Sequence, residues 1–232
     1  MIYVISDIHG EYGKYMEMLE KIKFSDEDTL FVLGDVVDRG PEPIRLLEDM
    51  SARENVILLK GNHELMTLNF LRKLNVEITK ENADTHLDNE TLHALMDWIR
   101  NGGRSTLQGF KQLPREKRDD MLDYLADTLA YEIVETNEKT FLLVHAGLGN
   151  YRPEKNLEEY TLEELLFARP DYQRQYFSNS DMYVVCGHTP TRFVTGMDEI
   201  YHSANNILID CGAVYGGRLA CLCLDTMQEF YV

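Results

Sequence analysis

The chain has 232 residues, and its 40 acidic side chains against 23 Lys and Arg leave a formal net charge of −17. A surface this acidic argues against a protein that binds nucleic acid through a basic face. An apolar fraction of 44%, with 13 Tyr and 9 Phe, excludes an acidic disordered chain. The length suits one substantial domain, and we expect residues 1–232 to form a single one.

Neither a membrane span nor a signal peptide is visible in the sequence. No stretch approaches the roughly 18 apolar residues that a span needs, and residues 1–5 are typical of a strand rather than of a charged leader. We therefore expect a cytoplasmic protein without a membrane partner. Four cysteines lie in apolar segments of the last quarter, where we expect buried, reduced thiols: Cys186, Cys211, Cys221 and Cys223.

Strand-like and helical patterns alternate through the first third of the chain. Apolar runs at 2–6, 29–33 and 55–60 predict three strands. A helical pattern follows each run, at 14–22, 44–50 and 64–74. This βαβαβα order predicts parallel strands joined by right-handed crossovers, and hence an α/β fold.

The middle of the chain, from about residue 76 to 130, interrupts this alternation. Apolar residues at 92, 95, 96 and 99 have helical spacing and precede Asn101-Gly102-Gly103, and those at 121, 122, 125 and 129 predict another helix. We expect a helical cap insertion that packs against the sheet and has no core of its own.

The last hundred residues are rich in strand-like runs. These runs predict strands at 140–144, 182–186, 206–210, 219–224 and 229–232. Thr161 and Glu164 have the spacing of a capping box ahead of a short apolar run, which predicts the start of a helix.

Five short polar motifs stand directly after apolar runs. Ligands of open α/β sheets gather beyond the carboxyl ends of the strands, so we expect these motifs to meet in space. Their Asp, Asn and His side chains are suitable ligands for divalent metals, and Asp35 could bridge two ions through its two oxygens. The predicted ligands are Asp7, His9, Asp35, Asn62, His145 and His188.

The motif set resembles the phosphoprotein phosphatase family of metallophosphoesterases, and it is closest to the compact bacterial and phage branch of that family. The resemblance covers nearly the whole chain and includes the segment 209–217 near the C-terminus. Ser6 replaces the glycine that usually precedes the first Asp, with little effect expected on the metal. The long loops that hold regulatory subunits are missing, so we expect no such subunit. The implied fold is a metallophosphoesterase β-sandwich with flanking helices.

The resemblance also implies roles for individual residues. Two divalent ions, Mn²⁺ or alternatively Fe²⁺ or Zn²⁺, would generate the hydroxide that attacks phosphorus directly. His63 would protonate the leaving oxygen, and Asp38 would orient its imidazole. Arginine binds phosphoryl oxygens in pairs, so Arg39 and Arg169 are expected at the substrate, with Tyr215 and Arg218 as further candidates. An alternative for Arg169 is a cation that stabilises a helix C-terminus.

The sequence motifs exclude two classes of enzyme, and three functions remain. Cys211 and Arg218 are separated by six residues rather than the five of a cysteine-dependent phosphatase, and no nucleotide-binding P-loop is present. The intact Asp38-Arg39-Gly40 and Glu64 favour hydrolysis of phosphoserine or phosphothreonine, or also phosphotyrosine, in proteins. The alternatives are a diadenosine tetraphosphate hydrolase or other nucleotide phosphohydrolase and, remotely, an inactive metal-binding scaffold. The expected partner is thus a phosphorylated protein or a small phosphoester.

Overall fold

The first sheet contains both ends of the chain. In the computed structural model, which describes residues 1–77 and 88–232, its strand order is β10-β9-β1-β2-β3. Strands β1 (Ile2–Ile5), β2 (Thr29–Val32) and β3 (Val56–Leu58) are parallel, as predicted. Strand β9 (Ala220–Cys223) pairs antiparallel with β1, and the edge strand β10 (Glu229–Tyr231) pairs antiparallel with β9.

The second sheet comes from the later part of the chain and has the order β4-β5-β6-β8-β7. Strands β5 (Lys139–Val144), β6 (Met182–Cys186) and β8 (Asn206–Leu208) are parallel. Strands β4 (Tyr131–Thr136) and β7 (Tyr201–Ser203) close the two edges in antiparallel pairings. Each sheet is therefore parallel where the polar motifs leave it.

The two sheets pack face to face, because successive side chains of a strand point to opposite faces. Val4 and Phe31 of the first sheet share a buried cluster with Phe141 and Val185 of the second. Their neighbours point the other way: Ile5, for example, lies in the cluster beneath the helices. This packing confirms the mixed α/β sandwich expected from the sequence.

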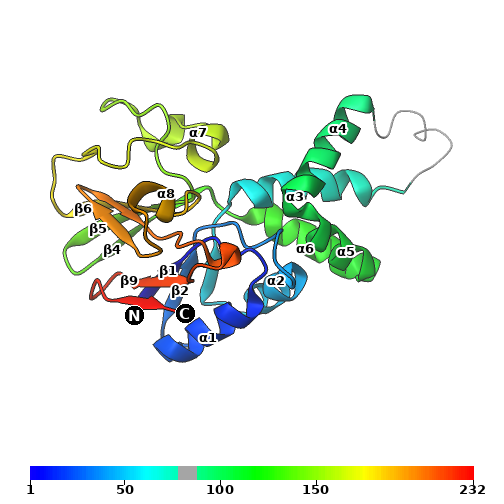
Figure 1. The fold of residues 1–232 in the computed structure, drawn as a ribbon, viewed down its shortest axis with the longest axis horizontal. Coiled ribbons are helices and arrows are strands. Elements are labelled where there is room, and N and C mark those ends of the chain that lie inside the picture. The colour runs from blue at the N-terminus through cyan, green and yellow to red at the C-terminus, as the bar shows by residue number, and fades with distance from the viewer. Residues whose placement is uncertain (78–87) are drawn as a thin grey trace.

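Helices cover the outer face of each sheet (Figure 1). The first sheet is covered by α1 (Tyr12–Ile22) and α2 (Pro43–Ser51), and α3 (Asn62–Leu74) contributes to the same buried cluster. The outer face of the second sheet lies under α7 (Leu162–Leu166) and a run of buried tyrosines. Thr161 and Glu164 form the predicted capping box at the start of α7.

The described part of the predicted cap consists of three helices and a π-helical turn, seen together with α3 at the right of Figure 1. These are α4 (Asn89–Trp98), η1 (Ile99–Gly103), α5 (Arg104–Gln112) and α6 (Arg115–Asp127). Their buried side chains, such as Trp98, Phe110 and Leu125, belong to the same cluster as the first sheet and its helices. Part of the predicted insertion, residues 78–87, lies outside the described residues.

The four cysteines are buried and unpaired by disulfides, as predicted. Among the helices of the described chain, none combines the length and the apolar character needed to cross a membrane.

Candidate metal centre and active site

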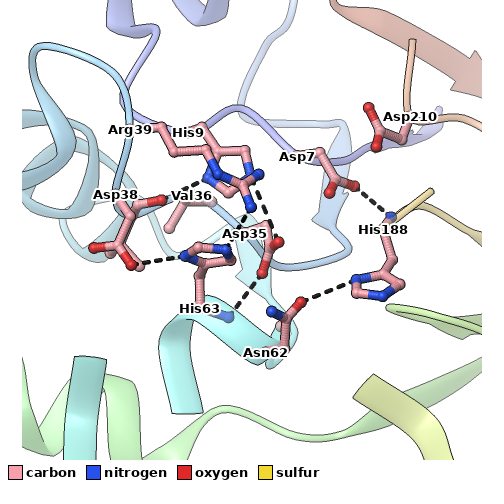
Figure 2. A network of polar contacts seen from close by, with 12 residues as sticks. Asp7, His9, Asp35, Val36, Asp38, Arg39, Asn62, His63, His188 and Asp210 are labelled. Atoms are coloured by element: carbon pink, nitrogen blue, oxygen red, sulfur yellow. Dashed lines mark hydrogen bonds and ion pairs between the residues drawn. The ribbon is translucent and has the colours of Figure 1, made fainter. Parts of the chain in front are cut away.

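The polar motifs meet at the ends of the strands from which they emerge (Figure 2). Asp7 and His9 follow β1, Asp35 follows β2, and Asn62 begins α3 just beyond β3. The backbone there is unusual: of the twelve non-glycine residues with positive φ in the described ranges, half belong to these motifs. Such conformations are costly for non-glycine residues and are concentrated at functional sites. The six are Asp7, His9, Asp35, Asp38, Arg39 and His188.

Asp35 lies at the centre of the cluster. Its Oδ2 is 3.5 Å from His9 Nε2, and its Oδ1 is 3.4 Å from His145 Nε2. Within the described residues it is the member shared by two possible metal-holding groups, one with His9 and His63 and the other with His145 and His188. The two oxygens of Asp35 thus face two different sets of imidazoles, which is the arrangement that a bridging carboxylate needs.

Two imidazoles are oriented by backbone carbonyls. His9 Nδ1 lies 2.7 Å from the carbonyl of Val37, and His145 Nδ1 lies 2.7 Å from that of Leu33. A ring nitrogen that donates to a carbonyl leaves the lone pair on the other nitrogen, Nε2. His9 Nε2 contacts the Arg39 guanidinium, and His145 Nε2 lies 2.8 Å from Asn62 Oδ1. Since both Nε2 atoms face Asp35, both rings have the orientation of metal ligands.

The donor set fits a pair of divalent cations on two further grounds. The buried Nε2 of His188 has no hydrogen-bond partner, although buried polar atoms normally have one. Burial, with Asp7 and Glu64 nearby, raises the pKa of Asp35 well above its usual value; burial and Asp7 do the same to the pKa of Asp210. Bound cations would use the free lone pair and neutralise the crowded carboxylates.

His63 lies beside this cluster, between a carboxylate and a guanidinium. Its Nδ1 is 2.7 Å from Asp38 Oδ2, and its Nε2 is 2.8 Å from Arg39 Nη2. Both His63 and Asp38 are fully buried. Burial and the Arg39 charge lower the pKa of His63 to about 2, so here the ring is neutral, donates from Nδ1 to Asp38 and accepts from Arg39. The predicted pairing of His63 with Asp38 is present as geometry.

An open pocket of about 680 Å³ lies over the cluster. It is lined by the predicted residues Arg39, Arg169 and Tyr215. Arg218, by contrast, donates to the backbone carbonyl of Asp198 and pairs with Glu199, and it is not a lining residue of this pocket.

Several lining residues were not predicted from the sequence. Asp210 is buried and lies two residues beyond β8, so the strand-end rule that selected the predicted ligands applied to it as well. Arg192 and Phe193 begin α8 (Arg192–Thr195), a helix too short to leave a periodic pattern. No sequence signal pointed to these two residues.

Two packed sheets with crowded carboxylates and imidazoles at their strand ends define a metallophosphoesterase. Residues 1–212 match the calcineurin-like phosphoesterase family, and the chain belongs to that family, whose members use divalent metals. The resemblance to phosphoprotein phosphatases is thereby confirmed at the level of the family.

Relatives with two different activities are similar to most of the chain. An asymmetrical bis(5'-nucleosyl)-tetraphosphatase PrpE of Bacillus anthracis is 26% identical over 99% of this chain and 92% of its own. The serine/threonine-protein phosphatase 1 of Salmonella typhimurium is 29% identical over 94% of this chain and 89% of its own. Among solved structures, a putative diadenosine tetraphosphatase has a TM-score of 0.65 at 19% identity and covers 100% of this chain and 92% of its own; this likeness shows the fold alone.

Proposed function

We propose that this protein hydrolyses a bis(5'-nucleosyl) tetraphosphate. The observation that carries the proposal is the composition of the pocket, where arginines lie beside exposed aromatic side chains that form an aromatic rim. The exposed fraction is 77% for Phe193, 52% for Tyr215 and 39% for Phe167. A dinucleoside polyphosphate is anionic in its middle and carries an aromatic base at each end, so its chemistry matches this pocket.

The aromatic rim adjoins the arginines. The Tyr215 ring centroid lies 5.4 Å from the guanidinium carbon of Arg39, and Phe167 is two residues from Arg169. Bases stack on aromatic side chains with little dependence on sequence, and each stack contributes about 1–3 kcal/mol. A nucleoside could therefore stack on the rim while its phosphates reach the arginines.

Within this function we assign the predicted site residues as follows. Asp7, His9, Asp35, Asn62, His145 and His188 hold two divalent cations, with Mn²⁺ as the proposed metal. When bound, such cations supply an activated water and neutralise phosphoryl oxygens. Arg39 and Arg169 orient phosphoryl oxygens by paired hydrogen bonds. His63, once its Nε2 carries a proton in place of the hydrogen bond from Arg39, would give that proton to the leaving oxygen while Asp38 accepts its Nδ1–H. We also retain the proposal that residues 1–232 form one domain.

A phosphoserine or phosphothreonine protein phosphatase is the second candidate. It was the first choice from the sequence, and the similarity to the Salmonella enzyme across most of the chain favours it. The dinucleotide now comes first, because a phosphopeptide accounts for the arginines and the dimetal cluster but does not require an aromatic rim. The PrpE similarity over nearly the whole chain points the same way.

Separate kinetic measurements on the two substrates test the proposal. Purified protein with Mn²⁺ receives diadenosine tetraphosphate or a phosphoserine peptide, and anion-exchange chromatography follows the products. We expect kcat/KM to be roughly tenfold or more higher for the dinucleotide, with all turnover lost when a chelator is added. Higher kcat/KM for the phosphopeptide would replace the first candidate with the second. The products identify the bond that is broken: two molecules of ADP for symmetrical cleavage, and ATP with AMP for asymmetrical cleavage.

A further inference from the structure

The Asp38 carboxylate is held by side chains of the cap as well as by His63. Trp98 Nε1, at the end of α4, donates to Asp38 Oδ2 at 2.8 Å. The Thr106 hydroxyl, in α5, donates to Asp38 Oδ1 at 2.6 Å. The same hydroxyl accepts the Asp38 backbone N–H at 2.9 Å, so Thr106 fixes both the backbone and the side chain of this residue.

All of these groups are buried. Trp98 is 2% exposed, and Thr106, Asp38 and His63 are fully buried. The Oδ2 that accepts from Trp98 is the one that lies 2.7 Å from His63 Nδ1 (Figure 2 shows the latter pair). Since a carboxylate has few ways to rotate while it accepts donors on both oxygens, its position sets the plane and the tautomer of the imidazole.

The Asn101-Gly102-Gly103 segment of the cap is shaped around the same contact. A Cβ on Gly103 would come within 2.3 Å of the Trp98 ring, and one on Gly102 would come within 2.5 Å of Arg39 Cγ. Gly102 has φ +116°, and its carbonyl accepts the Arg39 backbone N–H at 2.9 Å. Both glycines thus permit the close approach of the cap to Asp38 and Arg39, and stacking on Phe70 (ring centroids 5.4 Å apart) fixes the Trp98 ring.

We propose that Trp98 and Thr106 are positioning residues for proton donation by His63. They act through Asp38: by immobilising its carboxylate they hold the His63 ring so that Nε2 faces the leaving oxygen. The cap would then contribute to the chemical step itself and not only to substrate access. This inference rests on the proposed phosphoester hydrolysis by His63, but not on the identity of the natural substrate.

Two conservative variants remove the two donors of the cap and leave the longer contact of the Thr67 hydroxyl, 3.4 Å from Asp38 Oδ1. Trp98→Phe keeps an aromatic ring on Phe70 and deletes the N–H. Thr106→Val keeps the shape and deletes the hydroxyl, whereas Thr106→Ser restores it. Phe110→Leu is the matched control, because Phe110 is buried in the same helix as Thr106 but makes no hydrogen bond to Asp38.

The first readout is the leaving-group dependence of turnover by the Mn²⁺-loaded protein. p-Nitrophenolate departs readily without a proton, whereas phenolate needs one. Positioned general-acid catalysis contributes roughly 10²–10⁴-fold, so we expect Trp98→Phe and Thr106→Val to lower kcat for phenyl phosphate by about tenfold or more. We expect kcat for p-nitrophenyl phosphate to fall less than about threefold, with KM unchanged for both substrates, and Thr106→Ser to restore activity. In a His63→Asn background, Trp98→Phe should have no further effect, because coupled residues are not additive.

The second readout does not depend on activity. A hydrogen-bonded His63 Nδ1–H should give a downfield proton resonance that His63→Asn abolishes. We expect Trp98→Phe and Thr106→Val to shift or broaden this resonance, and Phe110→Leu to leave it in place. Equal loss of kcat for both aryl phosphates, or an unchanged resonance in both variants, would overturn the proposal. Because the two aryl phosphates carry no nucleoside, a failure of the dinucleotide assignment is seen separately, in the comparison of diadenosine tetraphosphate with the phosphoserine peptide.

Discussion

The carboxylate of Glu64 is fully buried and accepts the backbone N–H of Asp35 at 2.6 Å. It also accepts the N–H groups of Val36, at 2.9 Å, and Gly61, at 2.9 Å. One side chain in the first turn of α3 therefore supports the loop after β2 and the loop after β3, from which Asp35 and Asn62 project. From the sequence, Glu64 only favoured a phosphatase; the structure gives it a supporting role beneath the metal cluster.

Removal of this carboxylate should destabilise the protein. Glu64→Ala leaves several buried N–H groups without an acceptor, each at a cost of about 1–3 kcal/mol, so we expect the free energy of unfolding to fall by about 3 kcal/mol or more. Urea unfolding measures the loss. The control is Glu48→Gln, an exposed position on α2. If Glu64→Ala unfolds at the same urea concentration as Glu48→Gln, the supporting role is wrong.

Metal binding should stabilise the fold measurably. Burial and mutual repulsion raise the pKa values of Asp35 and Asp210, so the crowded carboxylates are stabilised when a cation enters. At a free Mn²⁺ concentration 100 times Kd the gain is about 2.7 kcal/mol. A thermal melt with Mn²⁺ against one with chelator detects it. Asp35→Asn should abolish the difference, whereas Asp26→Asn, at an exposed and distant position, should retain it.

Loss of the aromatic rim should weaken the binding of nucleosides selectively. Phe193→Ala or Tyr215→Ala removes a stacking surface, so we expect KM for diadenosine tetraphosphate to rise roughly five- to hundredfold. KM for p-nitrophenyl phosphate, which reaches only the arginines and the metal cluster, should stay the same. Met197→Ala is the control, because Met197 is 57% exposed nearby but does not line the pocket. An equal rise in KM for both substrates would count against base stacking.

Glu164 should make the stability of the α7 region dependent on pH. The ammonium of Lys155, 2.7 and 2.8 Å from its two oxygens, and the backbone of Thr161 lower the pKa of Glu164 from 4.5 to about 2. A carboxyl with a lowered pKa stabilises the folded state above its unfolded pKa, and this contribution is lost as the pH falls from about 4.5 towards 2. Glu164→Gln should therefore be less stable than the wild type at pH 7, with a difference that narrows through this range in urea titrations. Equal stability of Glu164→Gln and the wild type at pH 7 would contradict this role of the ion pair with Lys155.

The sequence predicted the strands that carry the site because apolar runs ended in chemically distinctive residues. The Asp7 and Asp35 strands begin and end within a residue of the predicted bounds. Strands β4 and β7 were missed, since their exposed or polar residues, such as Glu132 and His202, give no apolar run at a sheet edge. Helix α5 was missed because its polar residues obscure the periodicity around Phe110.

Contacts between residues far apart in the chain could not be predicted from sequence patterns. Trp98 is 60 residues from Asp38, and nothing in a helical periodicity indicates that its N–H meets that carboxylate. Arg218 was predicted as a further candidate at the substrate; in the structure η3 (Ala213–Tyr215) and the glycines after it reverse the chain, and Arg218 lies over the Tyr231 ring. The roles of the site residues themselves stay predictions until they are tested.

Because β9 pairs antiparallel with β1, the first sheet is completed only after a late part of the chain has been synthesised. During synthesis β1 emerges before β9, so one of its edges is completed only when residues 220–223 arrive, and residues 1 and 232 both lie at this part of the sheet (Figure 1). A fragment that stops at residue 212 would contain every proposed ligand and still leave the edge of a buried strand exposed, which favours aggregation. Residues 213–232 hold none of the proposed metal ligands, yet strands β9 and β10 within them complete this edge of the sheet.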